Sequence, residues 1–193
     1  MGKIIISTNS SFDGVVQDPD GKDGFALGGW FDQVIGDDRP EWAQFFVKEA
    51  LGASALLMGR TSDEWFASRW LDRTGEWADK LNGMPKYVVS STVEHTAWSN
   101  GTVISGGDMA AEVAKLKRET DGEILVYGSF QLGHALIEQD LVDEIRLMVL
   151  PVLVGDGVRL FGPTGGIRPL RLISTATVGN GIVSLAYEVV HEG

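Results

Sequence analysis

The stretch of residues 124–161 constrains the fold of this chain more than any other part of it. An apolar run (124–127) passes through Gly128-Ser129 into a segment with the apolar spacing of a helix (130–137), and a second apolar run (145–150) follows an acidic turn. A strand that enters a helix through glycine lets a ligand approach the backbone closely, and the first N–H groups of the helix have no partner inside it. The pattern predicts two neighbouring strands of an α/β sheet, with a nucleotide-phosphate site at the helix start.

Six further runs rich in apolar and β-branched residues predict the remaining strands: 3–8, 53–58, 85–89, 102–104, 170–178 and 182–190. The last two runs are joined by Gly179-Asn180-Gly181, in which Asn-Gly is typical of a hairpin turn with positive φ at both central residues. Helical segments lie between most of the others, one of them with Asp38 as its N-cap and Gly52 at its end. We therefore expect a single α/β domain over residues 1–193, mostly β-α-β, with an antiparallel hairpin at its C-terminal end.

The composition limits the partners that this chain can have. It carries 16 basic and 27 acidic side chains, and the formal net charge of −11 argues against a nucleic-acid surface and against anionic membranes. It contains no cysteine, and it has neither a signal-peptide pattern nor an apolar run approaching the roughly 20 residues of a membrane span. We expect a cytoplasmic protein that holds an anionic ligand by a local site rather than by its overall field.

Gly59 forms a second glycine corner directly after a predicted strand. The next residue, Arg60, has a fork of donors that can pair with a phosphate, or alternatively with Asp63 or Glu64. Ser90-Ser91 follows another predicted strand, at the end where α/β sheets bind ligands, although serines are also ordinary turn residues. Both of these strand ends, at Gly59-Arg60 and at Ser90-Ser91, suit a polyphosphate ligand.

A long segment rich in glycine and aspartate (9–39) separates the first predicted strand from the first predicted helix. It contains Ser11-Phe12-Asp13-Gly14 and two neighbouring aromatic residues, Trp30 and Phe31. Loops of this length in a compact domain are usually functional or mobile. The segment is therefore either a functional loop or a surface loop that the two aromatic side chains pin to the core.

Several common catalytic signatures are missing from the sequence. No G-x-G-x-x-G follows a predicted strand, and there is no Walker A lysine motif and no G-x-S-x-G elbow. The three histidines, His95, His134 and His191, have no helical metal-ligand spacing, so we expect no metal site. Hydrolase and metalloenzyme chemistry therefore have little support.

Taken together, the motifs resemble the dihydrofolate reductase-like superfamily and, more closely, its riboflavin-biosynthesis reductase branch, the RibD C-terminal domain. The resemblance covers nearly the whole chain in order and rests on these segments: Ser11–Gly14, Leu57–Arg60, Val89–Ser91, Val126–Ser129, Leu141–Leu147 and Pro151–Phe161. It implies a three-layer α/β fold with a mixed, mostly parallel sheet of about eight strands. It also implies NADPH across the strand ends, hydride transfer to a pterin-like or ribosyl-bearing pyrimidine ring, and a homodimer that pairs through the edge of the C-terminal hairpin.

The resemblance also assigns site residues by position. The residues implied to contact the cofactor are Gly59, Arg60 and Thr61 at the adenosine-side phosphates, Ser90 and Ser91 at the 2′-phosphate, and Gly128, Ser129, Phe130, Gln131 and Leu132 at the pyrophosphate. Asp13 and Gly14 are implied near the nicotinamide and substrate. The candidate proton donors are Asp13, ordered water and, more weakly, Glu41. Trp30, Trp42 and Phe46 are candidate walls of the substrate pocket, with at least one of them expected in the core.

Two departures from the family pattern shape the functional expectation. Folate-reducing members carry a carboxylate where this chain has Trp42 or Ala43, and Glu41 is one residue away, about 100° around a helix. Asp63 stands where an aromatic residue is common, and a carboxylate that faced the phosphates would repel them. We therefore expect a reductase of the 5-amino-6-(5-phosphoribosylamino)uracil type. The alternatives are a nucleotide-binding module without reductase activity and a reductase of another pterin-like small molecule.

Overall fold

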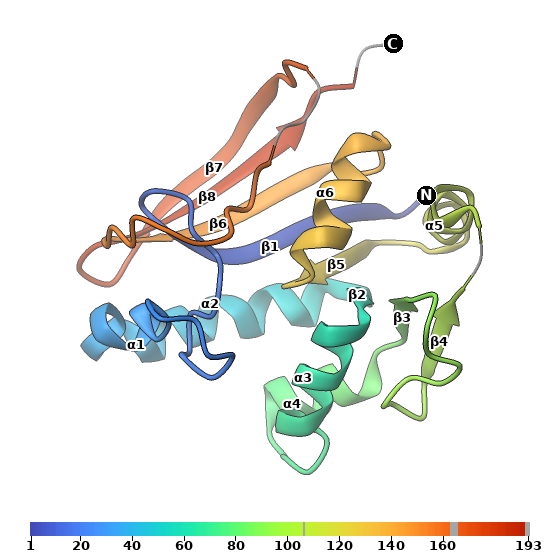
Figure 1. The fold of residues 1–193 in the computed structure, drawn as a ribbon, viewed down its shortest axis with the longest axis horizontal. Coiled ribbons are helices and arrows are strands. Elements are labelled where there is room, and N and C mark those ends of the chain that lie inside the picture. Colours follow the sequence, from blue (N-terminus) through green and yellow to red (C-terminus); the bar gives the residue numbers. More distant parts are fainter. Residues whose placement is uncertain (106, 163–165, 192–193) are drawn as a thin grey trace. The chain divides into compact units, whose positions relative to one another are not determined.

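The structure is a computed structural model that describes residues 1–105, 107–162 and 166–191 (Figure 1). Its strands are β1 (Lys3–Ser11), β2 (Ala53–Gly59), β3 (Lys86–Val89), β4 (Gly101–Ile104), β5 (Glu123–Tyr127), β6 (Glu144–Leu150), β7 (Leu170–Val178) and β8 (Ile182–Val189). Its helices are α1 (Trp30–Ile35), the 3₁₀ turn η1 (Gly36–Asp38), α2 (Arg39–Gly52), α3 (Arg60–Trp70), α4 (Glu76–Gly83), α5 (Met109–Glu119) and α6 (Phe130–Glu138).

The strands form one mixed, eight-stranded sheet in the order β4-β3-β2-β5-β1-β6-β8-β7. The pairs β2–β3, β2–β5 and β3–β4 are parallel, whereas β6–β8 and β7–β8 are antiparallel. Every run that the sequence predicted as a strand is one, and the mostly parallel sheet with a C-terminal antiparallel hairpin is confirmed. The chain divides into two compact units, one of Met1–Ile6 and Phe46–Asp143, the other of Ser7–Phe45 and Glu144–Gly193. They are called the first and second unit below.

Parallel strands form the core of the first unit. Leu56, Leu57 and Met58 of β2 are consecutive and each is fully buried, as are Leu125 and Val126 of β5. Consecutive buried residues in a strand mean that both faces of the sheet are covered, as βα crossovers require. The glycine corners after β2 and β5 therefore sit at the ends of rigid, buried strands.

Lys86 is fully buried at the start of β3, in the first unit. Its Nζ donates to the main-chain oxygens of Asn82 and Met84, at 2.8 Å each, and lies 4.2 Å from the centroid of the Trp98 ring. Burial, opposed by the charge of Asp63, lowers the pKa of Lys86 to about 8. The ammonium group thus anchors the segments on either side of β3.

The hairpin β7–β8 belongs to the second unit, and its turn differs from the prediction. Val178 pairs with Ile182, so three residues form the turn, and the left-handed residue is Gly179, with φ 60°, rather than Asn180. Asp38 explains the difference, because its carboxylate accepts hydrogen bonds from Asn180 N (2.9 Å) and Nδ2 (3.0 Å). The prediction that Asp38 caps a helix with its side chain is wrong, since the carboxylate holds this turn and α2 begins at Arg39.

The long segment after β1 is pinned by aromatic residues, as one of the two interpretations predicted. Trp30 and Phe31 are buried in α1, and Trp30 Nε1 donates to the main-chain oxygen of Gln17 at 2.9 Å. The buried carboxylate of Asp18 closes an inner turn by accepting from the N–H groups of Lys22 and two other residues. Trp30 therefore serves to hold this loop against its unit.

Two short helices, α1 and α4, have no counterpart in the sequence-based prediction. In α4 only Ala78 and Leu81 are fully buried, so the apolar period is too short to stand out. Among the described residues, no helix is long and apolar enough to cross a membrane.

We predict that Lys86→Met lowers the free energy of unfolding at pH 7 by about 2–4 kcal/mol. The main-chain oxygens of Asn82 and Met84 each lose a charged donor, although both still accept from Asn100 Nδ2, and Asp63 loses its cation. The pKa of Lys86 is about 8 in the folded protein, against an ordinary value of 10.5, so the folded state binds fewer protons between these values. The stability of the wild type relative to the variant should therefore rise between pH 8 and 10.5.

Urea denaturation across this pH range measures the effect, with the exposed Lys48→Met as the control. A difference in unfolding free energy between wild type and Lys86→Met that stays constant with pH would contradict this account of Lys86.

Candidate functional site

The two glycine corners of the first unit lie against each other. β2 runs parallel to β5, with Leu56 in register with Leu125, so both strands end at the same edge. Gly59 N donates to Ser129 Oγ at 2.9 Å, and a Cβ on Gly128 would come within 3.0 Å of Ser62 Oγ. The starts of α3 and α6 therefore lie side by side (Figure 1).

Neither of these helices is capped by its own N-cap side chain. Ser129 is the N-cap of α6, and Gly59 that of α3; neither makes a side-chain hydrogen bond to its helix. Ser129 instead turns its hydroxyl to Gly59 and adopts a left-handed φ of 56°, which serine rarely does. By contrast, Asp108 caps α5 in the usual way and accepts from Ala111 N at 2.9 Å. The first N–H groups of α3 and α6 are thus left for another acceptor, and an anion is the natural one.

The predicted pyrophosphate contacts after Ser129 differ in what they can offer. Gln131 is exposed and Phe130 is half-buried, so both side chains border the helix start. The side chain of Leu132 is buried in the core, so this residue can contribute only its main-chain N–H. The helix start therefore presents backbone donors rather than charge.

A third strand end joins the same edge of the sheet. Val89 of β3 is in register with Gly59, which places Ser90 just beyond the corner. Ser90 Oγ accepts from Thr92 N at 3.2 Å and lies 3.2 Å from Thr92 Oγ1, so this serine also makes a turn of its own. Ser91 is exposed in that turn. The predicted adenosine-side residues are thus brought to one edge of the first unit.

Arg60 and Thr61 are exposed at the start of α3. Arg60 Nη1 lies 3.2 Å from Glu64 Oε1, one helical turn away. Exposed pairs of this kind contribute little stability and exchange easily. The alternative pairing with Glu64 is therefore the one the structure shows, and the contact of Arg60 with a phosphate stays a prediction.

Asp63 is the residue whose carboxylate would repel a phosphate if it faced the start of α3, but its side chain points into the protein interior. Its side chain is buried and Oδ2 accepts from Ala97 N at 3.0 Å. Burial raises the pKa of this carboxyl above its usual value. A buried carboxyl that binds Ala97 N does not present its charge to the start of α3.

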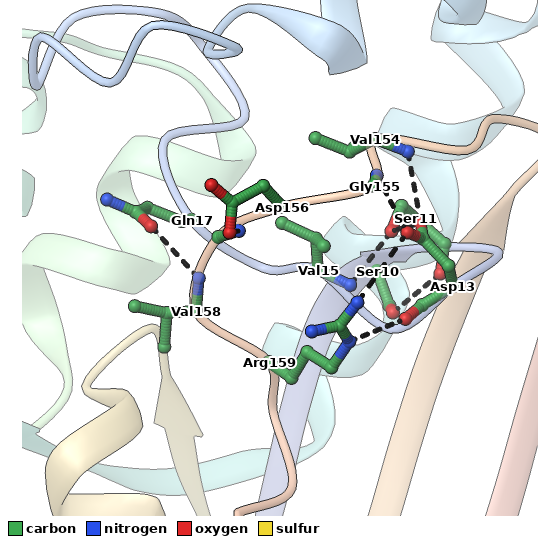
Figure 2. A network of polar contacts seen from close by, with 11 residues as sticks. Ser10, Ser11, Asp13, Val15, Gln17, Val154, Gly155, Asp156, Val158 and Arg159 are labelled. Atoms are coloured by element: carbon green, nitrogen blue, oxygen red, sulfur yellow. Dashed lines mark hydrogen bonds and ion pairs between the residues drawn. The ribbon is translucent and has the colours of Figure 1, made fainter.

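Asp13 lies in the second unit at the centre of a polar network (Figure 2). Its carboxylate accepts from Ser11 Oγ (2.7 Å), Val154 N (3.1 Å) and Gly155 N (2.8 Å). These hydrogen bonds, that from Ser11 above all, lower the pKa of Asp13 to about 2. The carboxylate is therefore ionised at neutral pH and has no proton to give, which argues against the predicted role as proton donor.

The other predicted substrate-side residues are placed differently from one another. Gly14 follows Asp13 with φ 86°, a left-handed value that suits glycine. Glu41 is exposed on α2, and Trp42 is half-buried, with Nε1 donating to Asn9 Oδ1 at 2.8 Å. Phe46, like Trp30, is a core residue, as expected for at least one of these aromatic side chains.

One buried polar pair of the first unit escaped the sequence reasoning. Tyr127, the last residue of β5, donates its hydroxyl to Glu49 Oε2 at 2.9 Å, and both side chains are buried. The signal that could have revealed it is a glutamate on the apolar face of α2, where a charged side chain needs a partner. Among the described residues, no group of three or more acidic or histidine side chains is arranged to hold a metal ion.

Family and sequence comparisons agree with this geometry. The chain matches the RibD C-terminal domain over residues 2–184. It is 24% identical over 180 residues to the uncharacterized protein YwjB of Bacillus subtilis (strain 168), which covers 93% of this chain and 94% of YwjB. It is 33% identical over 107 residues to the uncharacterized protein YyaP of the same strain, a match that covers 55% of this chain and only 56% of YyaP.

Solved structures share the fold. The putative riboflavin biosynthesis protein of Shewanella sp. PV-4 superposes with a TM-score of 0.75 at 20% identity, covering 98% of this chain and 99% of that one. Dihydrofolate reductase of Enterococcus faecalis superposes with a TM-score of 0.63 at 14% identity, covering 97% and 96%. The deaminase/5-amino-6-(5-phosphoribosylamino)uracil reductase of Thermotoga maritima superposes at 0.65 and 11% identity, where this chain covers 57% of that one. The fold is dihydrofolate reductase-like, as the motifs predicted.

We predict that Gly128→Ala destabilises the protein by about 1–2 kcal/mol, because φ is 58° at this position and alanine is strained there. The added Cβ would also meet Ser62 Oγ, so Ser62→Ala in the same chain should recover only the steric part of the loss. Thermal or urea unfolding measures both variants. Gly83→Ala, at the end of α4 with open space around it, is the control and should be close to neutral.

Proposed function

The chain belongs to the RibD C-terminal domain family, and from that membership we propose that it is an NADPH-dependent reductase of a small heterocycle. The observation that carries the proposal is the pair of uncapped helix starts at the ends of β2 and β5, joined by the Gly59–Ser129 hydrogen bond. Backbone N–H groups at a helix start suit a diphosphate, and in a chain with a net charge of −11 only such a local site can hold one.

The first unit is proposed to bind the diphosphate and adenosine part of the cofactor. The N–H groups at the start of α6 meet the diphosphate, and the hydroxyls of Ser90 and Ser91 border the adenosine ribose. Glycine at positions 59 and 128 keeps side chains out of the way of the phosphates. Arg60 is the first residue of α3 and follows the end of β2 directly. It can exchange its exposed contact with Glu64 for one with a phosphate oxygen.

Reduction of a heterocycle also needs a proton. NADPH, when bound, supplies the hydride. The low pKa of Asp13 makes this residue a hydrogen-bond acceptor, and Glu41 lies exposed on α2. We therefore propose that water delivers the proton, and that the turn containing Asp13 and Gly14 contacts and orients the substrate.

The proposed substrate is a pyrimidine that carries a ribosyl phosphate, as in 5-amino-6-(5-phosphoribosylamino)uracil. Support comes from the family and from the activity for which the Thermotoga maritima protein is named, since this chain shares the fold of that protein. Trp42, in place of a carboxylate near the start of α2, supports a substrate other than dihydrofolate. Its indole is committed to Asn9 and offers no charge to a pterin.

One observation favours the alternative, a binding module without reductase activity. Both carboxylates predicted to supply the proton are unsuited to it, since Asp13 is held ionised and Glu41 is exposed. A module of this kind would bind NADPH at the first unit and turn over no heterocycle. Measuring cofactor binding and turnover separately distinguishes the two functions.

We also propose that the protein is a homodimer that pairs through β7. This strand is last in the sheet order and exposes Leu170, Leu172 and Ile173, each between 44% and 52% accessible. An apolar edge strand with unpaired backbone groups favours addition of another strand.

We predict that light scattering gives the mass of two chains for the wild type. Leu172→Lys should shift the measured mass toward that of one chain, because a charge on the edge strand disfavours pairing. A wild-type mass of one chain contradicts the dimer.

We predict that Gln131→Glu weakens NADPH binding about ten-fold or more without destabilising the protein. A carboxylate in the first turn of α6 interacts favourably with the helix dipole but repels a diphosphate at the same place. Titration of NADPH against tryptophan fluorescence gives the Kd, and thermal unfolding gives the stability. Gln139→Glu, just past the other end of α6 and also exposed, is the matched control and should leave the Kd unchanged.

Turnover is followed by the absorbance of NADPH with the ribosylaminopyrimidine as substrate. Oxidation of NADPH that depends on this substrate supports the reductase. Binding without turnover of any pyrimidine or pterin supports the module, and absence of binding in the wild type overturns both.

A further inference from the structure

We propose that Asp13 is a positioning residue, which clamps the turn of residues 11–16 to the segment 151–160 and so sets the shape of the turn that meets the substrate. The inference rests on the proposed function for what the turn contacts. The clamp itself rests on contacts within the second unit alone (Figure 2).

Main-chain hydrogen bonds also join the turn of residues 11–16 to the segment 151–160. Phe12 N donates to Val152 O and Val16 N donates to Val158 O, both at 2.9 Å. Beside the second of these bonds, Val15 forms an antiparallel bridge with Arg159. These contacts bracket Asp13 on both sides, and on the segment they bracket residues 153–157.

The carboxylate of Asp13 holds this bracketed stretch. It crosses to the segment and accepts from Val154 N and Gly155 N, while Ser11 Oγ holds it from its own turn. Ser11 is buried, and its hydroxyl also accepts from Val15 N at 2.8 Å, which fixes the donor. Two adjacent N–H groups that converge on one carboxylate form an internal anion site, and Gly155 reaches the required φ of 90° without strain.

Arg159 completes the arrangement from the far side of the turn. Its Nε donates to the main-chain oxygen of Asp13 at 3.2 Å, and its Nη2 lies 4.0 Å from Asp13 Oδ2. A single residue thus receives donors on both its carboxylate and its carbonyl. Every donor to the carboxylate favours its ionised form, in line with the pKa of about 2.

An amide cannot replace this carboxylate. Three donors point at the side chain of Asp13, and asparagine would offer one oxygen and turn an NH₂ group toward N–H or O–H donors. Asp13→Asn should therefore release residues 153–157 while it keeps the volume of the side chain. The neighbouring side chains of Phe12 and Leu153 are 73% and 72% exposed, so they lie at the surface beside the clamp.

The chain offers a matched control in the same segment. Asp156 is an exposed carboxylate that accepts a hydrogen bond from the next residue, Gly157 N, at 2.8 Å. Asp156→Asn removes the same charge right beside the clamped amides without touching the turn of residues 11–16. It should leave both the clamp and the substrate kinetics unchanged.

Hydrogen exchange of the whole 193-residue chain tests the clamp directly. In Asp13→Asn, the amides of Val154 and Gly155 should exchange at least about ten-fold faster than in the wild type, since each loses a charge-assisted hydrogen bond. Ser11→Ala keeps the carboxylate and should give a smaller increase, which also covers the case that Asp13→Asn does not fold. Unchanged exchange at both amides in Asp13→Asn, or equal acceleration in Asp156→Asn, overturns the clamp.

Kinetics distinguish positioning from proton donation. If Asp13 is a positioning residue, its change to asparagine should raise the KM for the heterocycle about ten-fold, with the Kd of NADPH unchanged and the same pH profile of kcat as the wild type. A loss of kcat of about a thousand-fold with an unchanged KM would instead make Asp13 the acid and overturn the proposal. If the wild type turns over no substrate, the proposed function fails, while the exchange result still decides the clamp.

Discussion

The hydrogen bond from Gly59 N to Ser129 Oγ is the contact on which the rest of the site depends. A serine before a helix normally caps that helix, but here its hydroxyl is used to tie the end of β2 to the end of β5. The same contact therefore aligns two strand ends and leaves the start of α6 without a side-chain cap. To make this contact, Ser129 adopts an unfavourable left-handed φ. The buried strands β2 and β5 can hold it in that conformation.

In the second unit a side chain has the opposite effect, because it occupies backbone N–H groups instead of leaving them open. There the carboxylate of Asp13 satisfies two backbone N–H groups of a segment far away in the sequence, so those amides are closed to a ligand. Asp18 and Asp38 act similarly on backbone N–H groups of other turns. This chain is rich in acidic residues, and the direction of each carboxylate decides which backbone N–H groups it occupies. The starts of α3 and α6 in the first unit have no such cap.

The sequence predicted the strands well because each is a run of buried or alternating side chains, and burial is what the pattern records. The glycine corners at residues 59 and 128 were also predictable, since glycine suits a strand that turns at once into a helix. The contacts made by the side chains of Asp13, Asp38 and Asp63 were not predictable. Each finds a partner at a residue between 34 and 142 positions away, and no local propensity specifies such a contact. The hairpin turn shows the limit well, because the bond from Asn180 to Asp38 fixes a three-residue turn where Asn-Gly alone favours two.

The most direct test of the central claim is an NMR titration of the ¹⁵N-labelled protein with NADPH. If uncapped helix starts hold the diphosphate, the largest amide shifts will fall on residues 60–62 and 130–132, whose N–H groups lie in the first turns of α3 and α6 and gain an anionic acceptor. Amide shifts that spare these residues while NADPH binds elsewhere, or no shifts at saturating NADPH, would contradict the account.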